Sequence, residues 1–264
     1  METVLEVLDP SHVCSGLSPD AIGSLHRGTA MTTTSKEAHL KVAVPEIGDV
    51  SVLWLCPAGA RWLLVLAHGA GAGMSHPFLG KLAAELASLE IATFRYQFPY
   101  MEQRRRVPDS PPVLKSTVRA AVNAAGETAP DLPILAGGKS MGGRMTSQTA
   151  ADRPPEFEKV RGLAFFGFPL HPPGNPGTKR AEHLTQVQIP MLFLQGTRDQ
   201  FADLKLLRPI CASLGARATL HEIETADHSF HVLKSSGKTD AEVMRELAQS
   251  VRTWADALAV SGAA

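Results

Sequence analysis

From about residue 40 to the C-terminus, short apolar runs alternate with longer stretches in which apolar residues recur every three or four positions. The short runs are apolar on both faces, as in Trp62–Ala67, which is typical of strands buried in a parallel sheet. They predict strands at 40–44, 50–56, 62–67, 91–96, 134–136, 160–166, 189–194 and 218–224. The first two, with turn residues at 46–49 between them, predict a hairpin.

The longer stretches predict amphipathic helices, several of which have a recognisable start or stop signal. Ser75 is the expected cap of the first helix, and Asp109 or Ser110 opens the second. A later helical pattern contains Pro209, which we expect to kink or split the helix. The sequence Thr239-Asp240-Ala241-Glu242 forms a capping box before the last helix. Strands that alternate with helices predict an α/β fold, in which a mostly parallel sheet is covered on both faces.

The N-terminal segment differs from the rest of the chain. Residues 1–38 show neither period and are rich in Ser, Thr, Gly and His, so we expect a poorly ordered extension before a single domain at 39–264. The N-terminus lacks a basic segment followed by an apolar core, and no apolar run reaches the roughly 18 residues that a membrane span requires. We therefore expect a cytoplasmic protein.

Charge and cysteine content narrow the classes of partner. Lys and Arg total 26 and Asp and Glu total 26, so the formal net charge is +0 with neutral His. This balance gives no reason to expect nucleic acid or an anionic membrane as a partner. The three cysteines are widely spaced and form no C-x-x-C pair, so a zinc knuckle is not expected.

The clearest chemistry lies in Gly138-Lys139-Ser140-Met141-Gly142, a G-x-S-x-G sequence between an apolar strand and a helical segment. In that context the turn exposes the serine hydroxyl beyond the end of the sheet, and the glycines leave room for a strained backbone. Ser140 also lies at a helix N-terminus, where free N–H groups favour developing negative charge. The same residues resemble the end of a phosphate-binding P-loop, but that motif needs a glycine where Pro133 stands. A nucleophilic serine is therefore the favoured interpretation.

A serine nucleophile needs a base, and the base needs an acid that orients it. Asp199 lies just past the strand that ends at Leu194, and His228 follows the strand that ends at Glu224. The order Ser140, Asp199, His228 is that of α/β-hydrolase sites. Because the carboxyl ends of parallel strands share one edge of a sheet, we expect these three residues to meet there.

Both partners of the serine have a competitor nearby. Asp203 lies four residues after Asp199 and is expected to be helical already, so the acid closer to the strand is preferred. His231 competes with His228, which follows its strand more closely. The two histidines also resemble a metal pair, but the local sequence offers no obvious third ligand. We therefore predict neither a metal nor a cofactor.

The glycine-rich segment His68–Gly73 also follows a strand and precedes a helix. It resembles a dinucleotide-binding loop, but its third glycine comes one residue early and the next strand does not end in a carboxylate. A loop of N–H donors fits better. We expect the backbone N–H of Ala70 or Gly71 to bind an oxyanion together with that of Met141.

Four segments in combination resemble the dienelactone-hydrolase-like branch of the α/β-hydrolases: 68–71, 138–143, 196–199 and 227–230. Two further segments, 98–103 and 167–174, are similar to one subgroup of that branch. The subgroup contains many bacterial proteins, a vertebrate testis-expressed protein and a subunit of the non-specific-lethal chromatin complex. The resemblance covers roughly residues 40–258.

The resemblance implies an α/β-hydrolase fold with an eight-stranded, mostly parallel sheet, and it assigns Ser140 as nucleophile, Asp199 as acid and His228 as base. The best-known dienelactone hydrolases use a cysteine nucleophile instead, which makes dienelactone itself a weak choice of substrate. About two dozen residues separate the strands at 160–166 and 189–194, too few for a helical lid, and an open site favours small acyl groups. We expect a cofactor-independent serine hydrolase that cleaves a carboxylic ester. The alternative is a catalytically silent scaffold, because the chromatin subunit looks like one.

Overall fold

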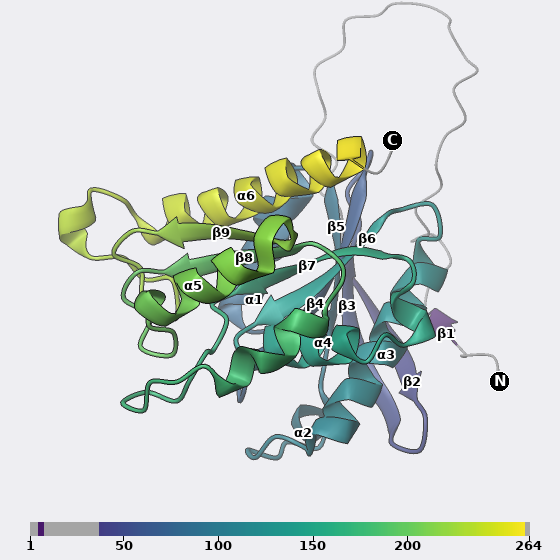
Figure 1. Ribbon diagram of the computed structural model, residues 1–264. Coiled ribbons are helices and arrows are strands. Elements are labelled where there is room, and N and C mark those ends of the chain that lie inside the picture. Colours follow the sequence, from purple (N-terminus) through teal and green to yellow (C-terminus); the bar gives the residue numbers. More distant parts are fainter. Residues whose placement is uncertain (1–4, 8–36, 262–264) are drawn as a thin grey trace, which may run out of the picture.

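The computed structural model of the chain describes residues 5–7 and 37–261. Its centre is one sheet of nine strands with helices on both faces (Figure 1). In spatial order the strands are β1 (Leu5–Val7), β2 (Ala38–Val44), β3 (Gly48–Leu55), β5 (Ile91–Tyr96), β4 (Trp62–Ala67), β6 (Ile134–Lys139), β7 (Val160–Phe166), β8 (Met191–Gly196) and β9 (Ala218–Ile223).

The sheet is mostly parallel, as the sequence predicts. β2 pairs antiparallel with β1 and β3, β3 pairs antiparallel with β5, and every neighbouring pair from β5 across to β9 is parallel. Strands β2 to β9 correspond to the eight predicted apolar runs. β1 was not predicted, because three residues are too few to show an alternating pattern. It lies in the expected N-terminal extension, of which residues 1–4 and 8–36 lie outside the described residues, so the domain boundary stays a prediction.

Two groups of helices bury the two faces of the sheet. The helices are α1 (Pro77–Ser88), α2 (Pro99–Glu102), α3 (Pro111–Thr128), α4 (Met141–Ala151), α5 (Leu204–Leu214) and α6 (Asp240–Ser261), with short 3-10 segments at η2 (Pro155–Phe157), η3 (Lys179–Gln186), η4 (Gly215–Arg217) and η5 (Lys234–Ser236). α1 and α6 pack on one face, whereas α3, α4 and α5 pack on the other (Figure 1). All six residues of β4 are buried, which explains their uninterrupted apolar sequence.

The start of α1 differs from the sequence prediction. Its N-cap is His76, whose Nδ1 accepts a hydrogen bond from the Phe78 N–H at 3.2 Å, so the expected Ser75 cap is wrong. The first helical residue is a proline without an N–H, so Phe78 carries the first donor that needs a partner, two residues after the imidazole. Ser110, one of the two expected starts, occupies the N-cap position of α3.

The expected split of α5 is also wrong, because the helix continues through Pro209, and a kink there stays a prediction. Pro209 lies on the exposed side, where water can bind the carbonyl of Lys205 that loses its helical partner. The capping box of α6 is confirmed. The Thr239 N–H donates to Glu242 Oε2 at 2.7 Å, and the Glu242 N–H donates to Thr239 Oγ1 at 3.3 Å.

At the edge of the sheet that carries the site, the connection between β7 and β8 is short. Between β7 and β8 the chain forms the 3-10 segment η3, which packs against α4, and contains no α-helix, so the expected absence of a helical lid is confirmed. β6, β8 and β9 run in the same direction and end at the same edge. Among residues 37–261, none of the helices has the length and apolar character needed to cross a membrane.

Candidate active site

Ser140 lies in a tight turn between the end of β6 and the first residue of α4. Its backbone has φ 51° and ψ −117°, a conformation that residues with a side chain rarely adopt. The Ser140 N–H donates to the Phe166 carbonyl at 3.1 Å, and the Arg144 N–H donates to the Ser140 carbonyl at 3.1 Å. These bonds hold the strained turn from both sides, in the strand–turn–helix context that the G-x-S-x-G sequence predicts.

The two glycines around Ser140 are required by close packing. A Cβ atom on Gly138 would lie 2.6 Å from the Ala67 carbonyl oxygen, and one on Gly142 would lie 2.5 Å from the His68 carbonyl oxygen. Real Cβ atoms do not approach backbone oxygens so closely. The absence of these side chains therefore brings the N-terminus of α4 against the end of β4 and the loop that follows it.

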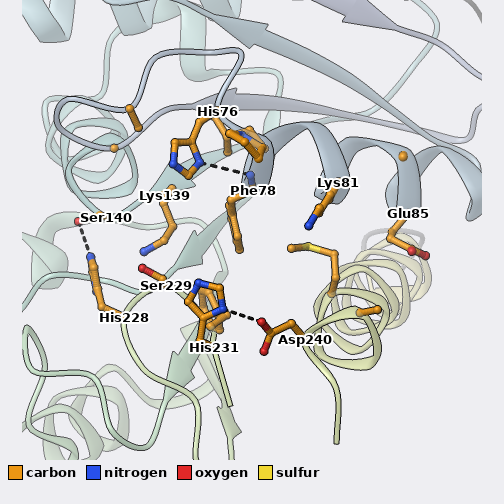
Figure 2. Close-up of a pocket in the computed structure, with 18 of the residues that line it drawn as sticks. His76, Phe78, Lys81, Glu85, Lys139, Ser140, His228, Ser229, His231 and Asp240 are labelled. Carbon is orange, nitrogen blue, oxygen red and sulfur yellow. Dashed lines mark hydrogen bonds and ion pairs between the residues drawn. The ribbon is translucent and has the colours of Figure 1, made fainter. Parts of the chain in front are cut away.

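His228 connects the serine to an acid. Its Nε2 lies 2.9 Å from Ser140 Oγ (Figure 2), and its Nδ1 lies 2.7 Å from Asp199 Oδ2. An ionised carboxylate only accepts hydrogen bonds, so Nδ1 carries the proton and Nε2 can accept the proton of the serine hydroxyl. The structure thus brings together the three residues that sequence reasoning selected from three strand ends.

The carboxylate of Asp199 is fully buried and held by three donors. Besides His228, the Gln195 Nε2 donates to Oδ2 at 2.5 Å, and the Phe201 N–H donates to Oδ1 at 2.8 Å. These bonds compensate the loss of hydration of a buried charge and fix the direction of the carboxylate. The Phe201 ring also lies 4.3 Å from the His228 ring, centroid to centroid, and restricts its rotation.

The two competing residues have other roles. Asp203 is the N-cap of α5, and its Oδ1 accepts the Lys205 N–H at 2.9 Å. His231 is exposed and pairs through Nδ1 with Asp240 Oδ2 at 2.6 Å. In the part of the chain that the structure describes, no group of three or more His, Cys, Asp or Glu residues could hold a metal ion.

The loop after β4 passes beside the serine, since a Cβ atom on Gly69 would lie 3.7 Å from Ser140 Cβ. The Gly71 N–H is already used, because it donates to Tyr100 Oη at 3.0 Å. The N–H groups of Ala70 and Met141 have no acceptor among the described residues. Of the two donors that the sequence left open in this loop, Ala70 therefore remains available to act with Met141.

Two buried side chains tie this loop to the segment that follows β5. His68 Nδ1 donates to the Gly69 carbonyl at 2.7 Å, and its Nε2 accepts the Phe98 N–H at 3.0 Å. Burial lowers the pKa of His68 to about 4, so the imidazole is neutral at pH 7 and has one donor and one acceptor. Tyr100 provides the second tie, through Gly71.

Sequence reasoning missed these supporting residues. Tyr100, in α2, and Phe201, in the loop after β8, reach the site along paths that only the folded chain defines. Gln195 did carry a signal, because it is a polar residue at the end of the otherwise apolar β8 and is completely buried. A buried amide needs hydrogen-bond partners, and here one of them is the acid of the site.

A cavity of about 720 Å³ begins at Ser140 and His228 and runs along α1 to the first turn of α6 (Figure 2). Phe78, Leu79, Phe230 and Met244 form an apolar part of its wall. Lys81, Glu85 and Asp240 lie at the end away from the serine (Figure 2). The volume is in the range of pockets that bind small molecules.

Comparisons with known proteins agree with this architecture. The family model for the α/β hydrolase domain matches residues 60–256. A serine hydrolase without a lid from Xanthomonas campestris is 19% identical, with a TM-score of 0.65 over 86% of this chain and 98% of that chain. A dienelactone hydrolase from Anabaena variabilis is 22% identical, with a TM-score of 0.64 over 83% of this chain and 96% of that chain.

The esterase domain of a Rhodothermus marinus protein is also similar. It is 14% identical, with a TM-score of 0.61 over 83% of this chain and 98% of that chain. At these identities the three structures establish the fold alone. The family match covers most of the sequence, and the chain belongs to the α/β hydrolase family.

Proposed function

We propose that the protein is a cofactor-independent serine hydrolase that cleaves a carboxylic ester through an acyl-enzyme intermediate. The observation that carries this proposal is the position of His228, which contacts Ser140 Oγ with one ring nitrogen and Asp199 Oδ2 with the other. An unactivated serine hydroxyl is a poor nucleophile, and this arrangement supplies the base and orients it.

In the acylation step, Ser140 Oγ attacks the ester carbonyl carbon while its proton passes to His228 Nε2. Asp199 stabilises the resulting imidazolium and holds its orientation. The tetrahedral intermediate collapses when the ester C–O bond breaks, and the leaving alcohol takes the proton from Nε2. Water then attacks the acyl-enzyme carbonyl carbon with His228 again as the base, which releases the acid and restores the serine.

Negative charge that develops on the carbonyl oxygen requires donors already in place. The N–H groups of Ala70 and Met141 fit this role, because Ala70 follows Gly69, which passes beside Ser140, Met141 follows Ser140, and neither N–H has an acceptor among the described residues. The N-terminus of α4 adds a favourable dipole at Met141. Donors fixed by the fold need no reorganisation during the reaction, which makes them effective.

The volume of the cavity indicates how long an acyl chain the site can hold. The absence of a lid favoured small acyl groups, but about 720 Å³ beside the serine leaves room for a longer chain along α1. Its apolar wall suits the hydrocarbon part of such a chain. An ester is preferred to an amide because esterases occur among the similar structures.

The alternative is a catalytically silent protein of the subgroup that contains the chromatin subunit. Segments 98–103 and 167–174 support membership of that subgroup as part of this proposal. A scaffold has no physical need to keep a nucleophile, a base and an acid in hydrogen-bond register, so the observed geometry favours the enzyme. A small-molecule ester in the cytoplasm, without nucleic acid or membrane as partner, completes the proposal.

Labelling with a fluorophosphonate probe and hydrolysis of 4-nitrophenyl esters test the proposal. We expect the wild-type protein to be labelled and to hydrolyse the esters, and we expect Ser140→Ala to lose both properties. Ser213→Ala is the matched control, because its Oγ is exposed and bonds only to its own helix, at the Ile210 carbonyl. A folded wild-type protein with neither labelling nor turnover would favour the scaffold.

A further inference from the structure

Lys139, the residue before Ser140, is a buried cation that the proposed reaction does not use. Its Nζ atom is shielded from solvent and has no hydrogen-bond partner among the described residues. Nearly all buried polar groups in folded proteins are paired, and an unpaired ammonium is among the most costly exceptions. Such a group indicates a partner that residues 37–261 do not supply.

The ammonium belongs to the cavity that contains the reacting groups. Lys139 lines this cavity, and Figure 2 shows its side chain extending toward His228 and Ser229. The stacked rings of Phe78 and Phe230 lie 5.9 and 5.5 Å from Nζ, measured to their centroids. These rings attract a cation weakly and limit the access of water. An anion that reaches Nζ would therefore meet it where electrostatic attraction is strong.

The charge of Lys139 is retained at neutral pH. Burial lowers the pKa of Lys139 to about 8, against the opposing effect of the carboxylates of Asp199 and Asp227. Asp199 is engaged by His228, Gln195 and the Phe201 N–H, and it makes no hydrogen bond with Lys139. Most molecules at pH 7 thus present a protonated amine with unused hydrogen-bonding capacity.

The surroundings indicate which anion fits. One ammonium supplies one positive charge, and the other lysine of the cavity, Lys81, lies at the far end, where it acts on Asp240. Glu85 and Asp240 also line the cavity and would repel a doubly charged group such as a phosphate. A phosphate also prefers several donors in a fixed arrangement. A carboxylate, with a single negative charge, matches the site.

We propose that the cavity binds esters that carry a free carboxylate, and that Lys139 holds this carboxylate as a specificity-determining residue. The substrates would be half-esters of dicarboxylic acids or esters of hydroxy acids. This inference rests on the proposed function, since it names the substrate class of the same site. Lys139 and Ser140 are adjacent, and the lysine stem is flexible, so the carboxylate lies a short chain away from the ester carbonyl.

Matched substrate pairs measure the preference directly. In the first pair, 4-nitrophenyl hemiglutarate and 4-nitrophenyl pentanoate have acyl chains of equal length, and only the former ends in a carboxylate. In the second pair, 4-acetoxybutanoate carries the carboxylate on the alcohol side of the ester, and butyl acetate is its neutral counterpart with an alcohol chain of equal length. We expect the wild-type kcat/KM to favour the carboxylate-bearing ester by about tenfold or more in at least one pair. No preference in either pair would overturn the inference.

Variants assign the preference to one side chain. Lys139→Met keeps most of the side-chain volume and removes the charge, and we expect the ratio of kcat/KM within the preferred pair to fall about tenfold. Lys81→Met is the matched control, because it removes the same charge from the far end of the same cavity. An equal fall in both variants would show that the overall charge of the cavity, and not Lys139, sets the preference.

Binding to an inactive protein separates this inference from the proposed function. Calorimetry with Ser140→Ala and monomethyl glutarate reports carboxylate recognition without turnover, and methyl pentanoate is the neutral comparison. We expect binding of monomethyl glutarate that is lost when Lys139→Met is added. Binding without esterase activity in the wild type would sustain the carboxylate site and reject the ester hydrolase. Ester turnover combined with equal binding of both compounds would support the ester hydrolase and reject the carboxylate site.

Discussion

The N–H of Gly71 donates a hydrogen bond to the phenolic oxygen of Tyr100 at 3.0 Å. Tyr100 is itself buried, and its own N–H donates to Asp109 Oδ2 at 2.8 Å. This bond joins the loop after β4 to α2 and removes Gly71 from the set of free donors. It also holds the loop that carries Ala70 and passes beside Ser140, so the proposed oxyanion site depends on a residue outside its own loop.

We expect Tyr100→Phe to lower kcat for a 4-nitrophenyl ester about tenfold, with a smaller change in KM, because the position of a donor matters most in the transition state. Steady-state kinetics measure this split. Tyr96→Phe is the control, since Tyr96 is also buried but its hydroxyl makes no hydrogen bond to the loop. Equal losses in both variants would mean that the effect is general destabilisation.

Asp199→Asn preserves the size of the acid and removes its charge. We expect kcat to fall on the order of a thousandfold, because an amide can stabilise the wrong tautomer of His228 and cannot stabilise the imidazolium. Asp203→Asn changes an acid four residues away that caps α5, so it should affect stability slightly and kcat little. If Asp203→Asn impaired turnover as much as Asp199→Asn, the assignment of the acid would be wrong.

The buried ammonium of Lys139 predicts a pH dependence of stability. Its pKa is about 8 in the folded protein and about 10.4 in an unfolded chain, so the unfolded state binds more protons between these values. The free energy of unfolding should therefore rise with pH in this window, by up to about 3 kcal/mol from this group. Urea unfolding should show Lys139→Met more stable than wild type at neutral pH and a smaller difference near pH 10. A difference that stays constant would contradict the buried charge.

The buried imidazole of His68 predicts a loss of stability at acid pH. Burial lowers its pKa to about 4, below the unfolded value of about 6.5, so the unfolded state binds the extra proton first as the pH falls. Stability should decline from about pH 6.5 to pH 4, by at most about 1.4 kcal/mol per pH unit from this group. An NMR titration should show no protonation of His68 above about pH 5. A midpoint near the ordinary histidine value would show that the imidazole is not buried as described.

The cavity along α1 predicts a dependence on acyl length. Ala84 lines the cavity next in sequence to Glu85, which lies at the end away from the serine, and a larger side chain there would shorten the space available. We expect Ala84→Phe to lower kcat/KM for 4-nitrophenyl octanoate relative to the acetate by about fivefold or more. The ratio of kcat/KM for the two substrates, taken within each protein, cancels general effects on activity. An unchanged ratio would place the acyl chain elsewhere.

The relation of sequence to structure differs between the three site residues and their supports. Ser140, Asp199 and His228 each follow a strand, and parallel strands end at one edge, so sequence order and periodicity were enough to bring them together. The preference for Asp199 over Asp203 followed from the same rule. The positions of Tyr100, in α2, and Phe201, in the loop after β8, depend on the paths of connecting segments, for which a single sequence carries no comparable rule.

Some local details of the fold and the site could not be decided from the sequence. Ser75 is the usual type of cap, yet the chain uses His76 because of where the first free N–H falls after Pro77. Pro209 usually ends a helix, yet α5 continues because the lost bond lies on the exposed side. The choice between Ala70 and Gly71 needed the position of Tyr100, which is 29 residues away from Gly71.

The most direct test of the account is the second-order rate constant for fluorophosphonate labelling of Ser140 in wild type, His228→Ala and His231→Ala. His228 contacts the serine hydroxyl, whereas His231 is exposed and pairs with Asp240. We predict a loss on the order of a thousandfold in His228→Ala and little change in His231→Ala. Equal labelling of all three proteins, with mass spectrometry locating the probe on Ser140, would contradict activation of the serine by His228.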